Sequence, residues 1–206
     1  MPYVAELQTF PDLSDDEIKN FAEAALAIYR ENGAKTRQDN EYRIKNGYMT
    51  PDLLEVFDSY TQAGVKLAKF TSIPLEQIPD WERFTFVKQV FPYVNAMEVR
   101  ILFMDSGKLV TPHVDQATRK YVLNFPIQHF EDSRTNFYKA LVDVKRMVFR
   151  AEEIELAHSF QYKPKTLYIL DTHVPHAIEL GENEPRIMLS YTILGKPEYQ
   201  KFVEKL

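Results

Sequence analysis

Apolar residues in the first third of the chain recur every three or four positions, which is the spacing of one face of a helix. Residues 14 to 32 show this pattern. It begins at Ser14 and Glu17, which form a capping box because each side chain can accept from the other residue's free backbone N–H. The pattern returns from Pro51 to about residue 69, with Thr50 as its N-cap. We therefore predict two helices, 14 to 32 and 51 to 69, joined by a polar segment.

The pattern changes at Arg83 to short runs of β-branched and aromatic residues, which favour strands. About nine such runs follow at the close spacing of a sandwich or barrel. They are RFTFVKQVF, MEVRILFM, KLVTPHV, KYVLNFPIQ, NFYKALV, RMVFR, TLYIL, HAIEL and RIMLSYTIL. Only AEEIELAH, residues 151 to 158, indicates a helical turn. The sequence therefore predicts a mostly β fold, with N-terminal helices followed by an antiparallel β-sandwich.

The chain has 206 residues, a length that fits one domain with a single sizeable core. We assign residues 1–80 to a helical N-terminal part that buttresses the sheet, and residues 83–195 to the β core. No internal repeat, low-complexity tract or long linker in the sequence marks a second domain.

Charge and cysteine content limit the chemistry. The formal net charge is -5 and the basic residues are scattered, so we expect no nucleic-acid partner. No run approaches the roughly 20 apolar residues of a membrane helix, and no basic and apolar leader opens the chain, so we expect a cytoplasmic protein with no membrane partner. Its oligomeric state stays open. The absence of cysteine excludes thiolate metal sites and cysteine nucleophiles, so any metal must be held by His, Asp or Glu.

The stretch TPHVDQAT places His113 and Asp115 two positions apart at the end of an apolar run. In an extended strand these side chains point to the same face, so an imidazole and a carboxylate would lie side by side. Such a pair also arises by chance at this composition, and QHFED contains a second one, His129 and Glu131. The second pair lies in a polar stretch between strands, so the first is the better metal-site candidate.

A third ligand would complete a two-His, one-carboxylate facial triad, which leaves open positions on the metal and suits an Fe(II) oxygenase. His158 lies in the predicted turn and is better explained by packing or exposure. His173 and His176 both follow the apolar strand TLYIL, and the residues alone leave both open. Asp171, just before them, is either a group that orients a ligand or a turn former.

Arg186 opens the apolar strand RIMLSYTIL, in which Ser190 shares its face. A buried guanidinium needs an anionic partner, and its planar fork binds a carboxylate through two hydrogen bonds. Arg186 could serve a dicarboxylate cosubstrate in this way. The alternative is an arginine at the sheet edge that pairs with Glu182 or Glu184.

With these residues, the sequence resembles the Fe(II)/2-oxoglutarate-dependent oxygenase superfamily, whose members share a double-stranded β-helix, a jelly-roll or cupin-like sandwich. The resemblance rests on HVD at 113 to 115, PHA with His176, and EPRIMLS with Arg186, and it covers residues 97 to 194. The superfamily has its arginine about ten residues after the distal histidine. Arg186 lies ten residues after His176 and thirteen after His173, so the resemblance implies His176 as the ligand.

Within that superfamily, YVLNFPIQ and LYILDTHVPHAIELGENEPRIMLSY look similar to the aspartyl/asparaginyl β-hydroxylase-like branch. Asn124, eleven residues after His113, matches a position that contacts 2-oxoglutarate there, although the residue in that branch is usually His. The branch often lacks the acidic ligand, whereas this chain has Asp115. Its substrate class is therefore not transferred.

The resemblance implies a dioxygenase that hydroxylates an amino acid, a protein side chain or a related small molecule, with succinate and CO2 as co-products. Fe(II) would be held by His113, Asp115 and His176, with O2 as the oxidant. Arg186 would bind the far carboxylate of 2-oxoglutarate, assisted by Ser190 and Asn124. Two alternatives stay open: a cupin-like metal enzyme without 2-oxoglutarate, whose usual HxH pattern this chain lacks, and a non-catalytic β-sandwich binding module.

Overall fold

The computed structural model describes residues 3–36, 51–93, 95, 98–105, 107–115, 119–142, 147–193 and 201–206. Its helices are α1 (Asp15–Thr36), α3 (Pro51–Gln62) and α4 (Thr85–Val90). The strands are β1 (Val4–Thr9), β2 (Lys69–Pro74), β3 (Val99–Asp105), β4 (Leu109–His113), β5 (Tyr121–Gln128), β6 (Arg134–Ala140), β7 (Ile154–Phe160), β8 (Thr166–Asp171), β9 (His176–Glu179) and β10 (Arg186–Thr192). None of the helices in these ranges has the length and apolar character needed to cross a membrane.

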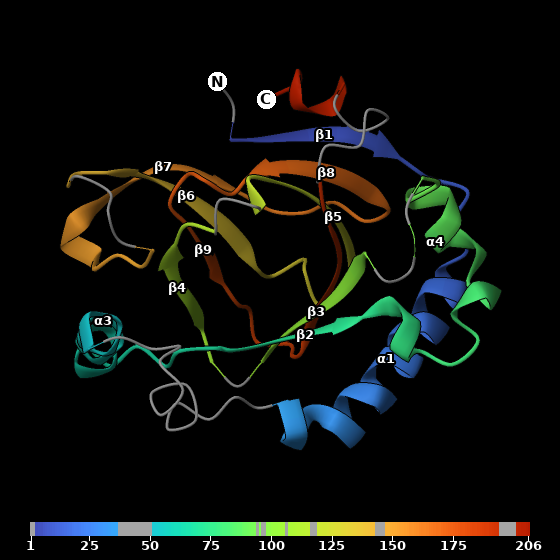
Figure 1. The fold of residues 1–206 in the computed structure, drawn as a ribbon, viewed down its shortest axis with the longest axis horizontal. Coiled ribbons are helices and arrows are strands. Elements are labelled where there is room, and N and C mark those ends of the chain that lie inside the picture. The colour runs from blue at the N-terminus through green and yellow to red at the C-terminus, as the bar shows by residue number, and fades with distance from the viewer. Residues whose placement is uncertain are drawn as a thin grey trace.

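The strands form two antiparallel sheets that face each other (Figure 1). The large sheet has the order β1-β8-β5-β10-β3-β2, and the small sheet has the order β4-β9-β6-β7. From β3 to β10 the chain crosses from one sheet to the other at each connection except the β6–β7 hairpin. That path is a double-stranded β-helix, the jelly-roll arrangement of two Greek keys. The predicted mostly β sandwich is confirmed.

Strand alternation gives the large sheet two apolar faces and the molecule two cores. Residues such as Ile101, Leu123 and Leu189 point outward and belong to one buried cluster with Phe21 of α1 and Phe86 of α4. Their neighbours Leu102, Val122 and Met188 point inward, toward the small sheet. Figure 1 shows α1 and α4 lying together on the outer side of the large sheet, away from β4 and β9. The inner face is therefore left to the space between the sheets.

The first predicted helix is confirmed, although α1 continues to Thr36, four residues past the predicted end at 32. Its predicted capping box is only half formed. The Glu17 amide donates to the Ser14 hydroxyl at 3.2 Å. The Glu17 carboxylate accepts instead from the amide of Phe86, at 3.3 Å, at the start of α4. The second predicted helix ends at Gln62, seven residues before its predicted end at 69. Gly64 adopts a φ of 80°, and a Schellman pair of backbone bonds from Gly64 and Val65 stops the helix.

The prediction of a strand at residues 83 to 91 is wrong, because the segment forms a 3₁₀ turn (Trp81–Arg83) followed by α4. Its buried residues Phe86, Val87 and Val90 follow helical spacing, and the alternating Phe and Thr at its start concealed this. The N-terminal 80 residues also contribute strands, since β1 pairs with β8 and β2 pairs with β3. The predicted helical part therefore supplies both edges of the large sheet.

The helical turn predicted at residues 151 to 158 is correct only for its first three positions. Ala151–Glu153 is a 3₁₀ turn, and strand β7 begins at Ile154. β7 is the edge of the small sheet and is exposed along most of its length, so its sequence lacks a clear alternation. Val148, in the predicted strand RMVFR, makes only an isolated bridge to His113, and Arg146 lies outside the described residues.

Candidate functional site

His113, Asp115 and His176 come together between the two sheets. His113 ends β4 and His176 begins β9, and the two residues are direct partners in the β4–β9 register. Their ring centroids lie 4.4 Å apart. One ligand atom from each histidine and one Asp115 oxygen all lie within 4.8 Å of one another. The two histidines, 63 positions apart in the sequence, thus form the three groups of a facial triad together with Asp115.

A matching backbone contact fixes both imidazoles. The Nδ1 of His113 lies 2.8 Å from the Thr111 carbonyl, and the Nδ1 of His176 lies 3.0 Å from the Val174 carbonyl. A carbonyl oxygen only accepts, so each Nδ1 carries the proton and donates it. Each Nε2 therefore keeps a free lone pair, which is the form in which histidine binds a metal.

Asp115 is held by its backbone and by its charge. Its amide donates to the Thr172 carbonyl at 2.9 Å, which fixes the segment just after β4 to the end of β8. Its carboxylate oxygens lie 3.6 Å from Nε2 of His113 and 3.3 Å from Nε of Arg119. Burial raises the pKa of Asp115, but His113 and Arg119 outweigh burial and lower this pKa to about 2. The carboxylate is therefore ionised and ready to bind a cation.

His176 is buried, and burial together with the nearby His113 lowers its pKa to about 3. The residue is therefore neutral across the physiological range, as a ligand must be. Since the same group has a pKa of 6.5 when it is solvated, the unfolded chain binds one more proton than the folded chain below pH 6.5. The contribution of His176 to the free energy of unfolding is therefore fully present above pH 6.5 and decreases as the pH falls toward 3.

We expect metal-free protein to lose stability on acidification partly through His176. Between pH 7 and pH 5, the wild-type free energy of unfolding should fall by about 2 kcal/mol more than that of His176→Gln, since each pH unit below 6.5 contributes about 1.4 kcal/mol. Urea unfolding in EDTA at the two pH values measures the difference. The exposed His158 provides the control, because His158→Gln should keep the wild-type slope. Equal pH dependence in wild type and His176→Gln would contradict this account of the buried imidazole.

A second polar group lies inside the sandwich, on the large sheet. Arg186 begins β10 and is only 2% exposed. Its guanidinium carbon lies 5.1 Å from the ring centre of Tyr162, and its Nε and Nη1 have no hydrogen-bond partner among the described residues. Glu182, which the sequence offered as a partner, pairs instead with Lys108 at 2.7 Å. Arg186 is thus a buried cation for which the described residues show no ion pair.

Asn124 and Ser190 lie side by side on the inner face of the large sheet, as direct partners in the β10–β5 register. The Asn124 amide donates to the Tyr162 hydroxyl at 3.1 Å, and its oxygen is buried without a partner among the described residues. Ser190 lies four positions along β10 from Arg186, about 13 Å further along the strand. Its hydroxyl accepts from Nη2 of Arg119 at 3.3 Å. Both side chains are therefore available to a ligand between the triad and Arg186.

The other candidates lie outside this group. His173 is exposed, and its amide donates to the Asp171 carboxylate at 3.0 Å, which makes Asp171 a turn former. His158 is an exposed residue of β7, not of a turn. His129 follows β5, and its Nδ1 donates to the Pro185 carbonyl, so the pair with Glu131 takes no part in the triad.

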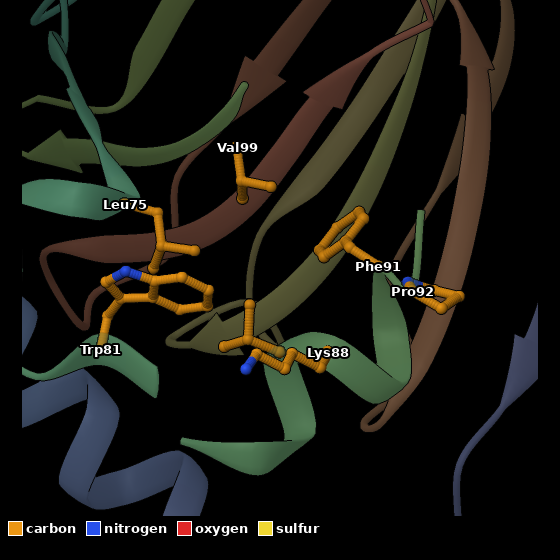
Figure 2. Close-up of a pocket in the computed structure, with 7 residues that line it drawn as sticks. Leu75, Trp81, Lys88, Phe91, Pro92 and Val99 are labelled. Atoms are coloured by element: carbon orange, nitrogen blue, oxygen red, sulfur yellow. The ribbon is translucent and has the colours of Figure 1, made fainter. Parts of the chain in front are cut away.

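A separate cavity of about 160 Å³ lies on the outer side of the large sheet (Figure 2). Trp81, Phe91 and Val99 are among the side chains that line it. Val99 points to the outer core, so the sheet separates this cavity from the triad. The cavity is therefore not part of the site described above.

Three residues at the site were not predicted from the sequence: Tyr162, Arg119 and Arg100. Tyr162 follows β7, which the sequence had not shown to be a strand. Arg119 lies four residues after Asp115 in a loop, and Arg100 is one of several charged residues in an apolar run. The sequence does contain a further signal for the two triad histidines. Each follows a proline, in TPH and VPH, and the Nδ1 of each donates to the carbonyl of the residue before that proline.

Comparisons with known proteins give distant structural similarities. No protein-family model matches the chain, and no curated protein matches its sequence. A prolyl-4-hydroxylase from Pseudomonas putida has a TM-score of 0.45 and 12% identity, covering 92% of this chain and 91% of that chain. A non-heme alpha ketoglutarate dependent epimerase from nogalamycin biosynthesis has a TM-score of 0.41 and 10% identity, covering 66% and 67%. A vicilin from hazelnut, Corylus avellana, has a TM-score of 0.32 and 7% identity, covering 61% and 28%. At this distance the similarity carries no argument about activity, which must come from the site itself.

Proposed function

We propose that the chain is a non-haem Fe(II)- and 2-oxoglutarate-dependent dioxygenase that hydroxylates an amino acid, a protein side chain or a related small molecule. One observation carries the proposal. The ends of β4 and β9 bring together a two-His, one-carboxylate group, and the facing large sheet holds a buried arginine that forms no ion pair among the described residues. A metal and a dicarboxylate satisfy the two groups together, and neither ligand alone satisfies both.

The donor set fits Fe(II). Two imidazoles and one carboxylate supply three ligand atoms from one side, which leaves the remaining positions for exchangeable ligands. Bound there, Fe(II) would supply O2 activation coupled to oxidative decarboxylation of 2-oxoglutarate. The backbone contacts at Thr111 and Val174 hold the two rings in place before the metal binds, so little ordering is needed on binding.

The dicarboxylate pocket follows from Arg186. Its Nε and Nη1 are buried without a hydrogen-bond partner among the described residues, so the guanidinium keeps N–H donors for a carboxylate, and Tyr162 lies beside it. Burial lowers the pKa of Arg186 because desolvation disfavours its charged form, and an anion that pairs with the guanidinium binds in a medium that strengthens the interaction. The unpaired oxygen of Asn124 and the hydroxyl of Ser190 add polar contacts toward the triad.

This pairing favours the proposal over its two alternatives. A cupin-like metal enzyme without 2-oxoglutarate would use the triad but leave Arg186 unpaired in the core. A non-catalytic binding module would need neither the ionised Asp115 nor the two oriented imidazoles. Buried charges without a partner are costly, so their presence indicates a ligand.

Metal removal tests the proposed reaction. Purified protein treated with EDTA should release no succinate from 2-oxoglutarate, and Fe(II) with O2 should restore release, whereas Zn(II), which binds the same ligands but has no redox chemistry, should not. The measurement is succinate formed per chain, with and without O2. Succinate release from the EDTA-treated protein, or equal release with Zn(II), would contradict an iron-dependent oxidation.

A further inference from the structure

Arg100 lies beside the proposed 2-oxoglutarate pocket and has no role in the function proposed so far. It belongs to the inner face of β3, where it is the direct register partner of Ser190 in β10. Its Nε and Nη2 donate to the hydroxyl and the carbonyl of Ser72, each at 2.9 Å. These two bonds fix the direction of the guanidinium, and no acidic side chain of the described residues forms an ion pair with it.

Arg119 approaches the same place from the loop before β5. It contacts Asp115 through Nε at 3.3 Å and Ser190 through Nη2 at 3.3 Å. Ser190 therefore lies between the two arginines, as the hydrogen-bond partner of one and the register partner of the other. The pKa of Arg100 is lowered by burial and then by the positive charge of Arg119. Asp115 lies beside Arg119 but would be taken by the metal, so the two like charges around Ser190 repel each other unless another anion lies between them.

A charge count shows what is missing. With the proposed ligands bound, the divalent ion, Asp115, 2-oxoglutarate and Arg186 have no net charge together. Arg100 and Arg119 then keep two positive charges beside the metal. Glu76 attracts Arg100, but Glu76 is exposed to solvent, which screens its charge. The site therefore has a surplus of positive charge where the primary substrate must approach.

We propose that the primary substrate carries an oxyanion, either a carboxylate or a phosphate, that binds between Arg100 and Arg119 at Ser190. The role of this anion rests on the proposed function, because the bound anion would lie next to the C–H bond that is oxidised. Anion binding itself does not depend on turnover. Nε and Nη2 of Arg100 already donate to Ser72, so the anion would bind through the remaining N–H donors and the positive charges of the two guanidinium groups. A neutral amide would leave both charges unmatched.

Ligand-detected NMR titrations of the chain test this site with three small probes: propionate, methyl phosphate and the neutral propionamide. The protein is held under anaerobic conditions with Fe(II) and saturating 2-oxoglutarate, so that Arg186 is occupied. We expect at least one anion to bind about tenfold or more tightly than propionamide. The tighter of the two anions identifies whether the substrate group is a carboxylate or a phosphate.

Arginine variants assign the binding to these residues. Arg100→Met and Arg119→Met should each raise the anion Kd about tenfold or more. Arg134→Met, at an exposed position on β6, is the matched control and should leave the Kd unchanged. If Arg100→Met does not fold, Arg100→Lys keeps the charge but not the fork, and it should still weaken anion binding.

The inference is overturned if neither anion binds better than propionamide, or if Arg100→Met and Arg119→Met retain the wild-type Kd. The same titration without Fe(II) and 2-oxoglutarate separates this result from the proposed function. Anion binding that depends on Arg100 and Arg119 would stand even if the chain did not turn over 2-oxoglutarate. Anion binding lost only in Arg186→Met would place the anion in the dicarboxylate pocket and contradict the inference.

Discussion

Asp115→Ala and His176→Ala should each abolish Fe(II)-dependent conversion of 2-oxoglutarate to succinate. Each change removes one of three ligands that lie within 4.8 Å of one another. Loss of a residue that merely orients a metal ligand costs 10- to 100-fold in metal affinity, so loss of a ligand itself should cost more than about 100-fold. Asp115→Ala also leaves the Arg119 guanidinium unopposed beside the metal, which disfavours a cation further.

The measurement is Fe(II) affinity together with succinate release at saturating 2-oxoglutarate. His158→Ala and His173→Ala are the matched controls, because both histidines are exposed and neither belongs to the triad. Both controls should behave as wild type. Full turnover in Asp115→Ala or His176→Ala would remove the triad from the mechanism, and loss of activity in His173→Ala would return that residue to the ligand set.

Arg186→Met should have opposite effects on stability and on cosubstrate binding. In the ligand-free protein, replacing a buried unpaired cation with an apolar side chain of similar length should raise the free energy of unfolding by about 1–4 kcal/mol. The KM for 2-oxoglutarate should rise at least about 30-fold, since removing one partner of a buried ion pair costs about 2–5 kcal/mol. Fe(II) affinity should change far less.

Two measurements check this pair of effects: urea unfolding of the ligand-free protein, and initial rates against 2-oxoglutarate concentration. Arg134→Met is the control for loss of a surface arginine and should change neither quantity. Arg186→Lys keeps the positive charge but not the planar fork, so it should recover part of the KM and none of the added stability. An unchanged KM in Arg186→Met would show that Arg186 serves the structure alone.

The strands that carry the triad and Arg186 were predictable from their apolar runs. β4, β5, β8, β9 and β10 bury apolar side chains on one or both faces, and their sequences show it. The closeness of His113 and His176 was not visible locally, because it depends on the pairing of β4 with β9. A family resemblance supplied the expected distal histidine, and the structure shows the register that brings it to His113.

The parts that were missed have local patterns that tertiary contacts overrule. α4 contains aromatic and β-branched residues that favour strands, yet Glu17 caps its start and three of its residues fill the outer core. β7 is an exposed edge strand without clear alternation, so neither the strand nor the Tyr162 that follows it was found. Arg100 and Arg119 are separate surface-like residues in the sequence, and only the fold brings both to Ser190.

The most direct test of the account is an anaerobic titration of Fe(II)-loaded protein with 2-oxoglutarate, followed by visible absorption. Chelation of the metal by the 2-oxo acid end should produce a new absorption band that saturates at one 2-oxoglutarate per chain. The band should be absent in Asp115→Ala and should require a much higher 2-oxoglutarate concentration in Arg186→Met. A wild-type protein that binds Fe(II) but shows no spectral change with 2-oxoglutarate would contradict the account.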